Sequence, residues 1–199
     1  MCIEFEKEPK KKYVASSTSE EVLVYYKRID KNDPNHFIVK GDEIAYVICP
    51  DGQEIPVTDP GTYKTLIKPV DVIWIRKIPT DIKVGVPKEA TEIGIGFHAV
   101  MRLHPTNPSL IVQSVKRKNL SIGEVRDVLR NIAREAFQAL INNMHENIEE
   151  YRRLFNKKLN KLLAATNLAG FTAVTSYIGF SYMCKPTELL EADLHEYVP

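Results

Sequence analysis

The sequence contains little cysteine and no excess of charge of one sign, and each shortage excludes a class of protein. The three cysteines, Cys2, Cys49 and Cys184, are widely spaced in the 199 residues and odd in number. They therefore argue against a disulfide framework and favour a reducing cytoplasm. The 27 basic and 26 acidic side chains nearly cancel and leave a formal net charge of +1. Such a small charge excludes a whole-molecule field that would gather nucleic acid.

Long apolar runs are also missing. No segment approaches the roughly 20 apolar residues that a membrane-spanning helix requires. The most apolar stretch, residues 162–183, is interrupted by Asn167, Gly170 and Thr172. Charged side chains follow almost directly after Met1, from which we expect no secretory signal. These features predict a cytoplasmic protein without a transmembrane segment.

The composition that remains is typical of a folded globular protein. The hydrophobic fraction is 44% and the charged fraction is 27%, enough apolar material for a core in a chain of this length. We expect a flexible, charged and serine-rich tail at residues 1–20 and a single domain at residues 22–184. Residues 186–199 form an acidic tail that can hold a short helix, with Leu189, Leu190 and Leu194 on one side. The high Lys, Glu and Ile content hints at a heat-adapted source.

The N-terminal two-thirds consists of short β-branched runs separated by turn residues, the pattern of a sheet. Strands are predicted at Val22–Arg28, His36–Val39, Glu43–Cys49, Glu54–Val57, Tyr63–Ile67, Val70–Lys77 and Asp81–Val86. The longest, Thr91–His104, alternates over its full length, with residues such as Phe97 and Met101 on one face and His98 and Arg102 on the other.

Helical patterns take over after Pro105. Asn107 and Pro108 predict the start of a short helix that ends near Val115. Ser121 and Glu124 form a capping box for a helix at about residues 121–145, and apolar spacing predicts a second helix at about 148–165. A final strand is expected at Phe171–Cys184. Strands followed by helices and one further strand indicate an α+β fold with a mostly antiparallel sheet.

No group of residues has the spacing of an active site. Gly94 and Gly96 lie inside a predicted strand, whereas a phosphate loop needs its glycines at a strand-to-helix turn. The five histidines are dispersed, and the cysteines lie in or beside apolar strands. Serines of the predicted tail (Ser16, Ser17 and Ser19) cannot be held in place as nucleophiles. We therefore expect no catalytic, cofactor-binding or metal-ligating residues and no enzyme activity.

Basic residues form the most distinctive surface pattern. Arg153, Lys157 and Lys161 recur every four residues and so lie on one face of the predicted helix, beside Arg152 and Lys158. Two further clusters occur at residues 116–118 and 10–12. A solvent-exposed helix face explains the pattern most simply, and binding of nucleic acid or an anionic membrane surface is the alternative.

The order of these segments resembles the SPFH or band 7 superfamily, which includes stomatin, prohibitin and flotillin relatives and has the vault shoulder domain as a soluble cousin. The likeness extends from Phe37 to Cys184. It rests on the run Phe37–Val47 with its Lys-Gly-Asp-Glu entry, the Pro60-Gly61-Thr62-Tyr63 turn, and the long strand followed by Pro108. The resemblance implies a non-catalytic assembly domain, although the chain lacks a membrane hairpin and a long heptad helix.

Three functions therefore remain open. The first is a scaffold that associates with itself or with another protein through the helix Val125–Met144, an exposed strand edge or the leucines of the C-terminal tail. The second is binding of nucleic acid or an anionic surface through the basic helix. The third is an enzyme or small-ligand site built from residues distant in sequence, for which His98, Arg102 and His104 would be examined first.

Overall fold

The computed structural model describes residues 2–6, 12–16, 21–88, 91, 94–141 and 147–181. Its contacts divide the chain into two compact units, one made of Met1–Pro79 with Pro105–Gly123 and the other of Thr80–His104 with Glu124–Pro199. The described residues form 3 helices and 11 strands in antiparallel sheets, which confirms the predicted sheet-dominated α+β class. The single domain predicted for residues 22–184 stays a prediction.

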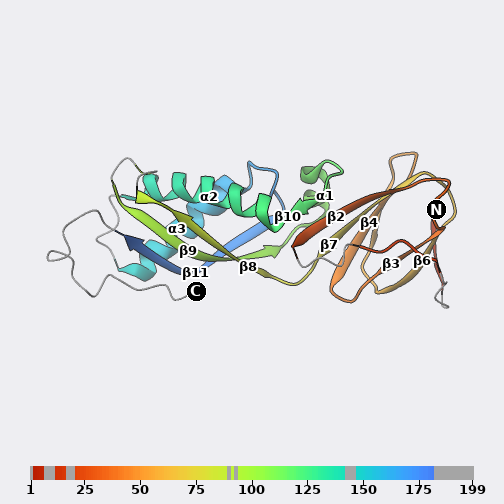
Figure 1. Cartoon of the computed structure of the whole chain (residues 1–199), viewed down its shortest axis with the longest axis horizontal. Coiled ribbons are helices and arrows are strands. Elements are labelled where there is room, and N and C mark those ends of the chain that lie inside the picture. Colours follow the sequence, from red (N-terminus) through yellow and green to blue (C-terminus); the bar gives the residue numbers. More distant parts are fainter. Residues whose placement is uncertain are drawn as a thin grey trace. The chain divides into compact units, whose positions relative to one another are not determined.

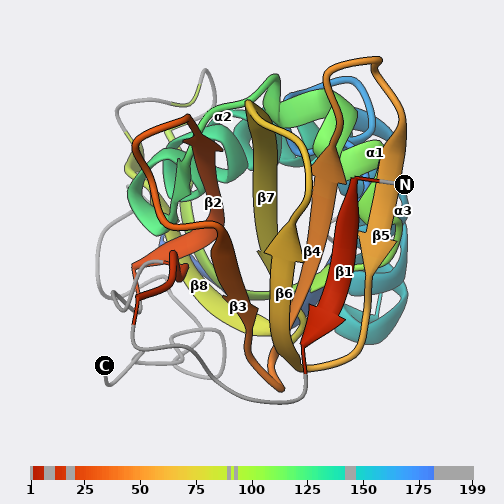
Figure 2. The same ribbon diagram turned by 90° about the vertical axis from the view of Figure 1, so that its right-hand side faces the viewer.

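Two facing sheets make up the first unit, and their elements can be followed in Figure 1 and Figure 2. The smaller sheet has the strand order β1 (Ile3–Glu6), β6 (Gly61–Thr65), β3 (His36–Val39). The larger sheet has the order β10 (Leu120–Ser121), β2 (Val22–Ile29), β7 (Val70–Arg76), β4 (Glu43–Ile48), β5 (Glu54–Val57). Figure 2 looks onto the smaller sheet with the larger sheet behind it, with β1 and β5 labelled. The short helix α1 (Pro108–Val115) begins at Asn107, as predicted, and belongs to the same unit.

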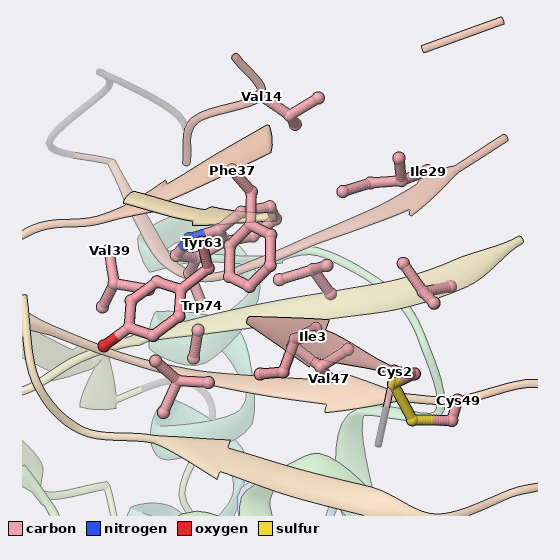
Figure 3. Packing of buried hydrophobic residues seen from close by; sticks show 14 residues of the cluster. Cys2, Ile3, Val14, Ile29, Phe37, Val39, Val47, Cys49, Tyr63 and Trp74 are labelled. Atoms are coloured by element: carbon pink, nitrogen blue, oxygen red, sulfur yellow. A yellow bond between two sulfur atoms is a disulfide. The ribbon is translucent and has the colours of Figure 1, made fainter. Parts of the chain in front are cut away.

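Aliphatic and aromatic side chains fill the space between the two sheets (Figure 3). Phe37 of β3 is fully buried, stacks on Tyr63 of β6 and meets Trp74 of β7 edge-on. The indole nitrogen of Trp74 donates a 2.8 Å hydrogen bond to the carbonyl oxygen of Ile38, so its one polar atom is satisfied inside the core. Burial of each such ring contributes about 1.5–3 kcal/mol to folding.

The N-terminal segment differs from the flexible tail that the sequence predicted. Ile3–Glu6 is strand β1, and Val14 forms a bridge with Phe37 at the edge of β3. Ser16 is buried, and its hydroxyl donates a hydrogen bond to the buried carboxylate of Glu43. The alternation of Ile3, Glu4 and Phe5 is a strand pattern. The neighbouring lysines and serines led instead to the prediction of a tail.

A disulfide joins Cys2 to Cys49 across 47 positions of sequence, contrary to the expectation drawn from the cysteine count. It connects the residue before β1, in the smaller sheet, to the residue after β4, in the larger sheet (Figure 3). An odd number of cysteines excludes complete pairing but does not exclude one bond. The disulfide therefore counts against the predicted reducing compartment, because disulfides persist mainly in oxidising surroundings.

The second unit has a three-stranded sheet in the order β11 (Phe171–Ser181), β9 (Gly96–Pro105), β8 (Thr80–Val86). Helices α2 (Ile122–Ala139) and α3 (Ile148–Leu163) pack against one face of it. Phe97 of β9 lies 4.7 Å from the ring of Phe137 in α2 and 6.0 Å from that of Phe155 in α3. Both helices thus contribute to a single aromatic cluster on the sheet.

Most predicted boundaries lie within two residues of the observed ones, and the start of β9 and the end of α2 differ by more. Strand β9 begins at Gly96, later than the predicted Thr91, and α2 ends at Ala139, earlier than the predicted residue 145. Helix α3 agrees with its prediction to within two residues. The end of the predicted final strand and the C-terminal leucines Leu189, Leu190 and Leu194 lie outside the described residues.

The disulfide gives a first testable prediction. Replacing both Cys2 and Cys49 by serine should lower the free energy of unfolding by about 2–4 kcal/mol, because the unfolded chain regains the freedom of a long closed loop. Urea unfolding of the oxidised wild type and the double variant measures the difference. Addition of a reductant should destabilise the wild type to the same extent and leave the variant unchanged; equal stability in all four samples would contradict the bond.

Candidate functional site

The predicted basic stripe is exposed on α3. Arg153, Lys157 and Lys161 all have solvent-exposed side chains, one above the next along the helix. Arg153 is engaged by Glu150, to which its Nε donates at 2.9 Å, and this contact holds the pKa of the Glu150 carboxyl below its ordinary value. Of the two other predicted clusters, residues 116–118 follow α1, and Lys12 is the one described residue of 10–12.

The apolar face of α2 is not available for assembly. The buried residues of this helix are Val125, Leu129, Ile132, Ala133, Ala136 and Phe137, and they face the interior of the second unit. The interface predicted for Val125–Met144 stays a prediction, and in the described part of that helix it would have to use residues outside this buried stripe.

The polar face of the long strand carries neighbouring contacts but no convergent site. Arg102 donates two hydrogen bonds to Asp81 of β8, from Nε at 2.7 Å and from Nη2 at 2.9 Å. His98 stacks on Tyr177 of β11 with ring centroids 5.9 Å apart, and burial raises the pKa of the Tyr177 hydroxyl. Among the described residues, no three His, Cys, Asp or Glu side chains are grouped closely enough to hold a metal ion.

Three sheet edges are closed by different devices. At the outer edge of β11, the Asn160 side chain of α3 accepts from the Ala173 amide and donates to its carbonyl, while Asn156 accepts from the Thr175 amide. The outer edge of β5 contains Pro56, which has no amide hydrogen. At β3 the amide of Val14 donates to the His36 carbonyl. Each device prevents addition of another strand.

The outer edge of β1 has no such cover among the described residues. The amide of Leu66 donates to the Cys2 carbonyl, and the register places Ile3 opposite Thr65 and Phe5 opposite Tyr63. In an antiparallel ladder alternate residues bond to the same neighbour. Since Cys2 and Glu4 bond toward β6, the amide and carbonyl groups of Ile3 and Phe5 point outward.

Side chains along this edge are suited to contact with another chain. The Phe5 ring is 53% exposed and lies edge-on to Tyr63 at 5.4 Å, so it is the exposed end of the aromatic row that starts at buried Phe37. Two further large apolar side chains of the same unit, Leu66 and Ile67, are 49% and 50% exposed. Glu4, on the opposite face of the strand from Phe5, is exposed and acidic.

A buried carboxylate is the other feature that the sequence analysis missed. Asp71 is 6% exposed and lies in β7, on the face turned away from the smaller sheet. The Tyr26 hydroxyl donates to its Oδ1 at 3.0 Å, and Arg117 Nε is 3.1 Å from its Oδ2. Burial, followed by the nearby carboxylate, raises the pKa of the Tyr26 hydroxyl. The signal was present in the sequence as one acid in an apolar strand, which requires a partner when buried.

Comparison with known proteins assigns the chain to no family. No protein-family model matches the chain, and no curated protein matches it. None of the helices that the structure describes has the length and apolar composition needed to cross a bilayer.

The contact between Arg102 and Asp81 gives a second prediction. The hydrogen bond from Arg102 lowers the pKa of the Asp81 carboxyl from its ordinary value of 3.8. The stabilisation it supplies is therefore complete above pH 3.8 and disappears as the pH falls through the lower pKa of the folded protein. An NMR titration of the Asp81 carboxyl carbon should give a midpoint below 3.8, and Arg102→Gln should move it upward. The control Arg130→Gln, which removes a cation from α2, should leave the midpoint in place.

Proposed function

We propose that this protein is a non-catalytic scaffold domain that binds an extended segment of another protein by adding it as a strand beside β1. The supporting observation is the outer edge of β1, where backbone donors and acceptors of Ile3 and Phe5 point outward beside an exposed aromatic ring. Strand addition derives its affinity from main-chain hydrogen bonds and its specificity from alternate side chains.

The side chains of β1 define the chemistry of the partner. An added strand would place apolar residues against Ile3 and Phe5 and, on the other face, a residue beside Glu4. A basic residue at that position is favoured by charge. A second copy of β1 is less suitable, since the antiparallel pairings with the greatest overlap bring Glu4 opposite Glu4 or Glu6, and like charges directly opposite one another are destabilising.

The proposed scaffold role rests on the same outer edge of β1. The likeness to the SPFH or band 7 superfamily supports an assembly role, and strand addition requires no catalytic group. A cytoplasmic location is part of the proposal. The disulfide between Cys2 and Cys49 is the observation that counts against it.

A proline substitution tests the edge directly. Phe5→Pro removes an amide hydrogen that points outward and leaves the bonds of Glu4 and Glu6 to β6 in place, as Pro56 does in β5. Peptides selected from a random library on the wild type should alternate apolar and basic residues. Phe5→Pro should weaken their binding by tenfold or more, since several main-chain hydrogen bonds are lost together.

Two controls separate the backbone from the side chain. Phe5→Ala keeps the outward amide and should weaken binding less than Phe5→Pro. Hydrogen exchange should slow at the Phe5 amide when a selected peptide is added and should not change at Glu4, which is already bonded to β6. Absence of any selected peptide, or equal binding to wild type and Phe5→Pro, would remove the proposal.

The exposed cations of α3 support a second function, binding of a nucleic acid or an anionic membrane surface. Lys157 and Lys161 project from one helix face together with Arg153, whose charge is partly compensated by Glu150. Phosphate binding by such residues releases counterions and depends steeply on salt.

Exchange of these three cations for alanine provides the test. If the surface binds phosphates, the triple variant should lower affinity for single-stranded DNA and reduce the slope of log K against log salt by up to about 3. Arg126, Arg130 and Arg134 of α2 have the same spacing and are also exposed, so their triple alanine variant is the matched control. Unchanged DNA binding in the α3 variant would exclude this function.

A further inference from the structure

One end of the outer face of the larger sheet holds a cavity of about 220 Å³. Cross-strand neighbours form its floor, because Arg28 of β2 lies opposite Asp71 of β7, and Asp71 lies opposite Ile48 of β4. Arg117, which follows α1, completes the lining with Cys49, Pro50, Gly52 and Pro69. The site thus gathers residues from four separate parts of the sequence, which is why no local motif indicates it.

Arg117 is held in position by its backbone and by Asp71. Lys116 and Arg117 are consecutive residues in the left-handed region, with φ of 50° and 60°, a conformation that costs energy for residues other than glycine. The carboxylate of Asp71 has both oxygens engaged, one by the Tyr26 hydroxyl and the other by Arg117 Nε. This contact holds the guanidinium group of Arg117 through its Nε.

Arg28 presents its guanidinium group in the same manner. Its Nε donates to Asp30 Oδ1 at 3.2 Å, and Asp30 does not line the cavity. Among the described residues, the terminal amino groups of Arg28 and Arg117 have no hydrogen-bond partner within the protein. The lining contains these two cations and one carboxylate, so it has a net positive charge.

We propose that this cavity binds a small organic anion, whose carboxylate or phosphate group is held between the terminal amino groups of Arg28 and Arg117. Guanidinium groups recognise both kinds of oxyanion through pairs of hydrogen bonds. Ile48, Pro50 and Pro69 supply apolar surface for the body of the ligand. A second cavity of about 120 Å³ shares Cys49 and Pro50 with the first and adds Ile67, which extends the apolar wall.

Calorimetric titration of the full chain at fixed chloride concentration tests the site with three probes: inorganic phosphate, acetate and hexanoate. Saturable binding is expected for at least one of them. Arg28→Gln should weaken it about tenfold, since a charge-assisted contact is lost. The matched control is Arg130→Gln, an equally exposed arginine that is also paired with an aspartate, and it should bind as the wild type does.

Asp71→Asn distinguishes a binding site from a purely structural ion pair. The variant keeps the shape of the side chain but removes the only negative charge of the lining, so anion affinity should increase several-fold. A structural role alone predicts lower stability and no change in affinity. Arg28 is half-exposed, so Arg28→Gln should fold normally. Its loss of anion affinity therefore tests the proposal even if Asp71→Asn fails to fold.

The choice among the probes identifies the source of the oxyanion. Tighter binding of hexanoate than of acetate assigns an organic acid whose apolar part lies along Pro50, and tighter binding of phosphate assigns a phosphorylated compound. The proposal is overturned if no probe saturates, or if Arg28→Gln and Arg130→Gln bind equally. Neither Arg28 nor Arg117 belongs to the β1 edge, so either proposal can fail without the other.

Discussion

Strand β7 is buried on both faces, and much of the first unit depends on that constraint. One face supplies Trp74 to the core between the sheets, where its indole nitrogen bonds to the Ile38 carbonyl. The other face contains Asp71, whose charge has to be compensated in place because a buried carboxylate without partners is costly. Tyr26 and the left-handed Arg117 provide that compensation. A polar cluster is thereby built at the end of an otherwise apolar sheet.

The treatment of sheet edges follows a second constraint, since an unpaired strand edge attracts other chains. The protein closes β11 with asparagine side chains, β5 with Pro56 and β3 with Val14. The first two devices use side chains and the third uses a backbone bridge, in each case where the backbone groups of the strand point outward. The outer edge of β1 has no such device among the described residues, and it also carries the exposed Phe5, which is the reason to connect it with a partner.

Local patterns predicted the elements well and their assembly poorly. The period-two runs located the strands, Asn107 located the start of α1, and helical spacing located α3, because each depends on neighbouring residues. The disulfide, the outward-facing edge of β1 and the pairing of Asp71 with Arg117 depend on residues 46 or more positions apart or on register, which no local pattern contains. The alternation Ile3-Glu4-Phe5 was present but was outweighed by the lysines and serines that follow. The α2 face was predicted as a possible interface because periodicity identifies an apolar stripe without telling what covers it.

The bond between Cys2 and Cys49 makes the attachment of β1 independent of the chain that follows it. A peptide bond hydrolysed anywhere between Glu6 and Lys12 would leave the N-terminal fragment covalently joined to the end of β4. The fragment would separate from the rest only in denaturant with a reducing agent. Proteolytic nicking of this segment would therefore not by itself detach the edge strand.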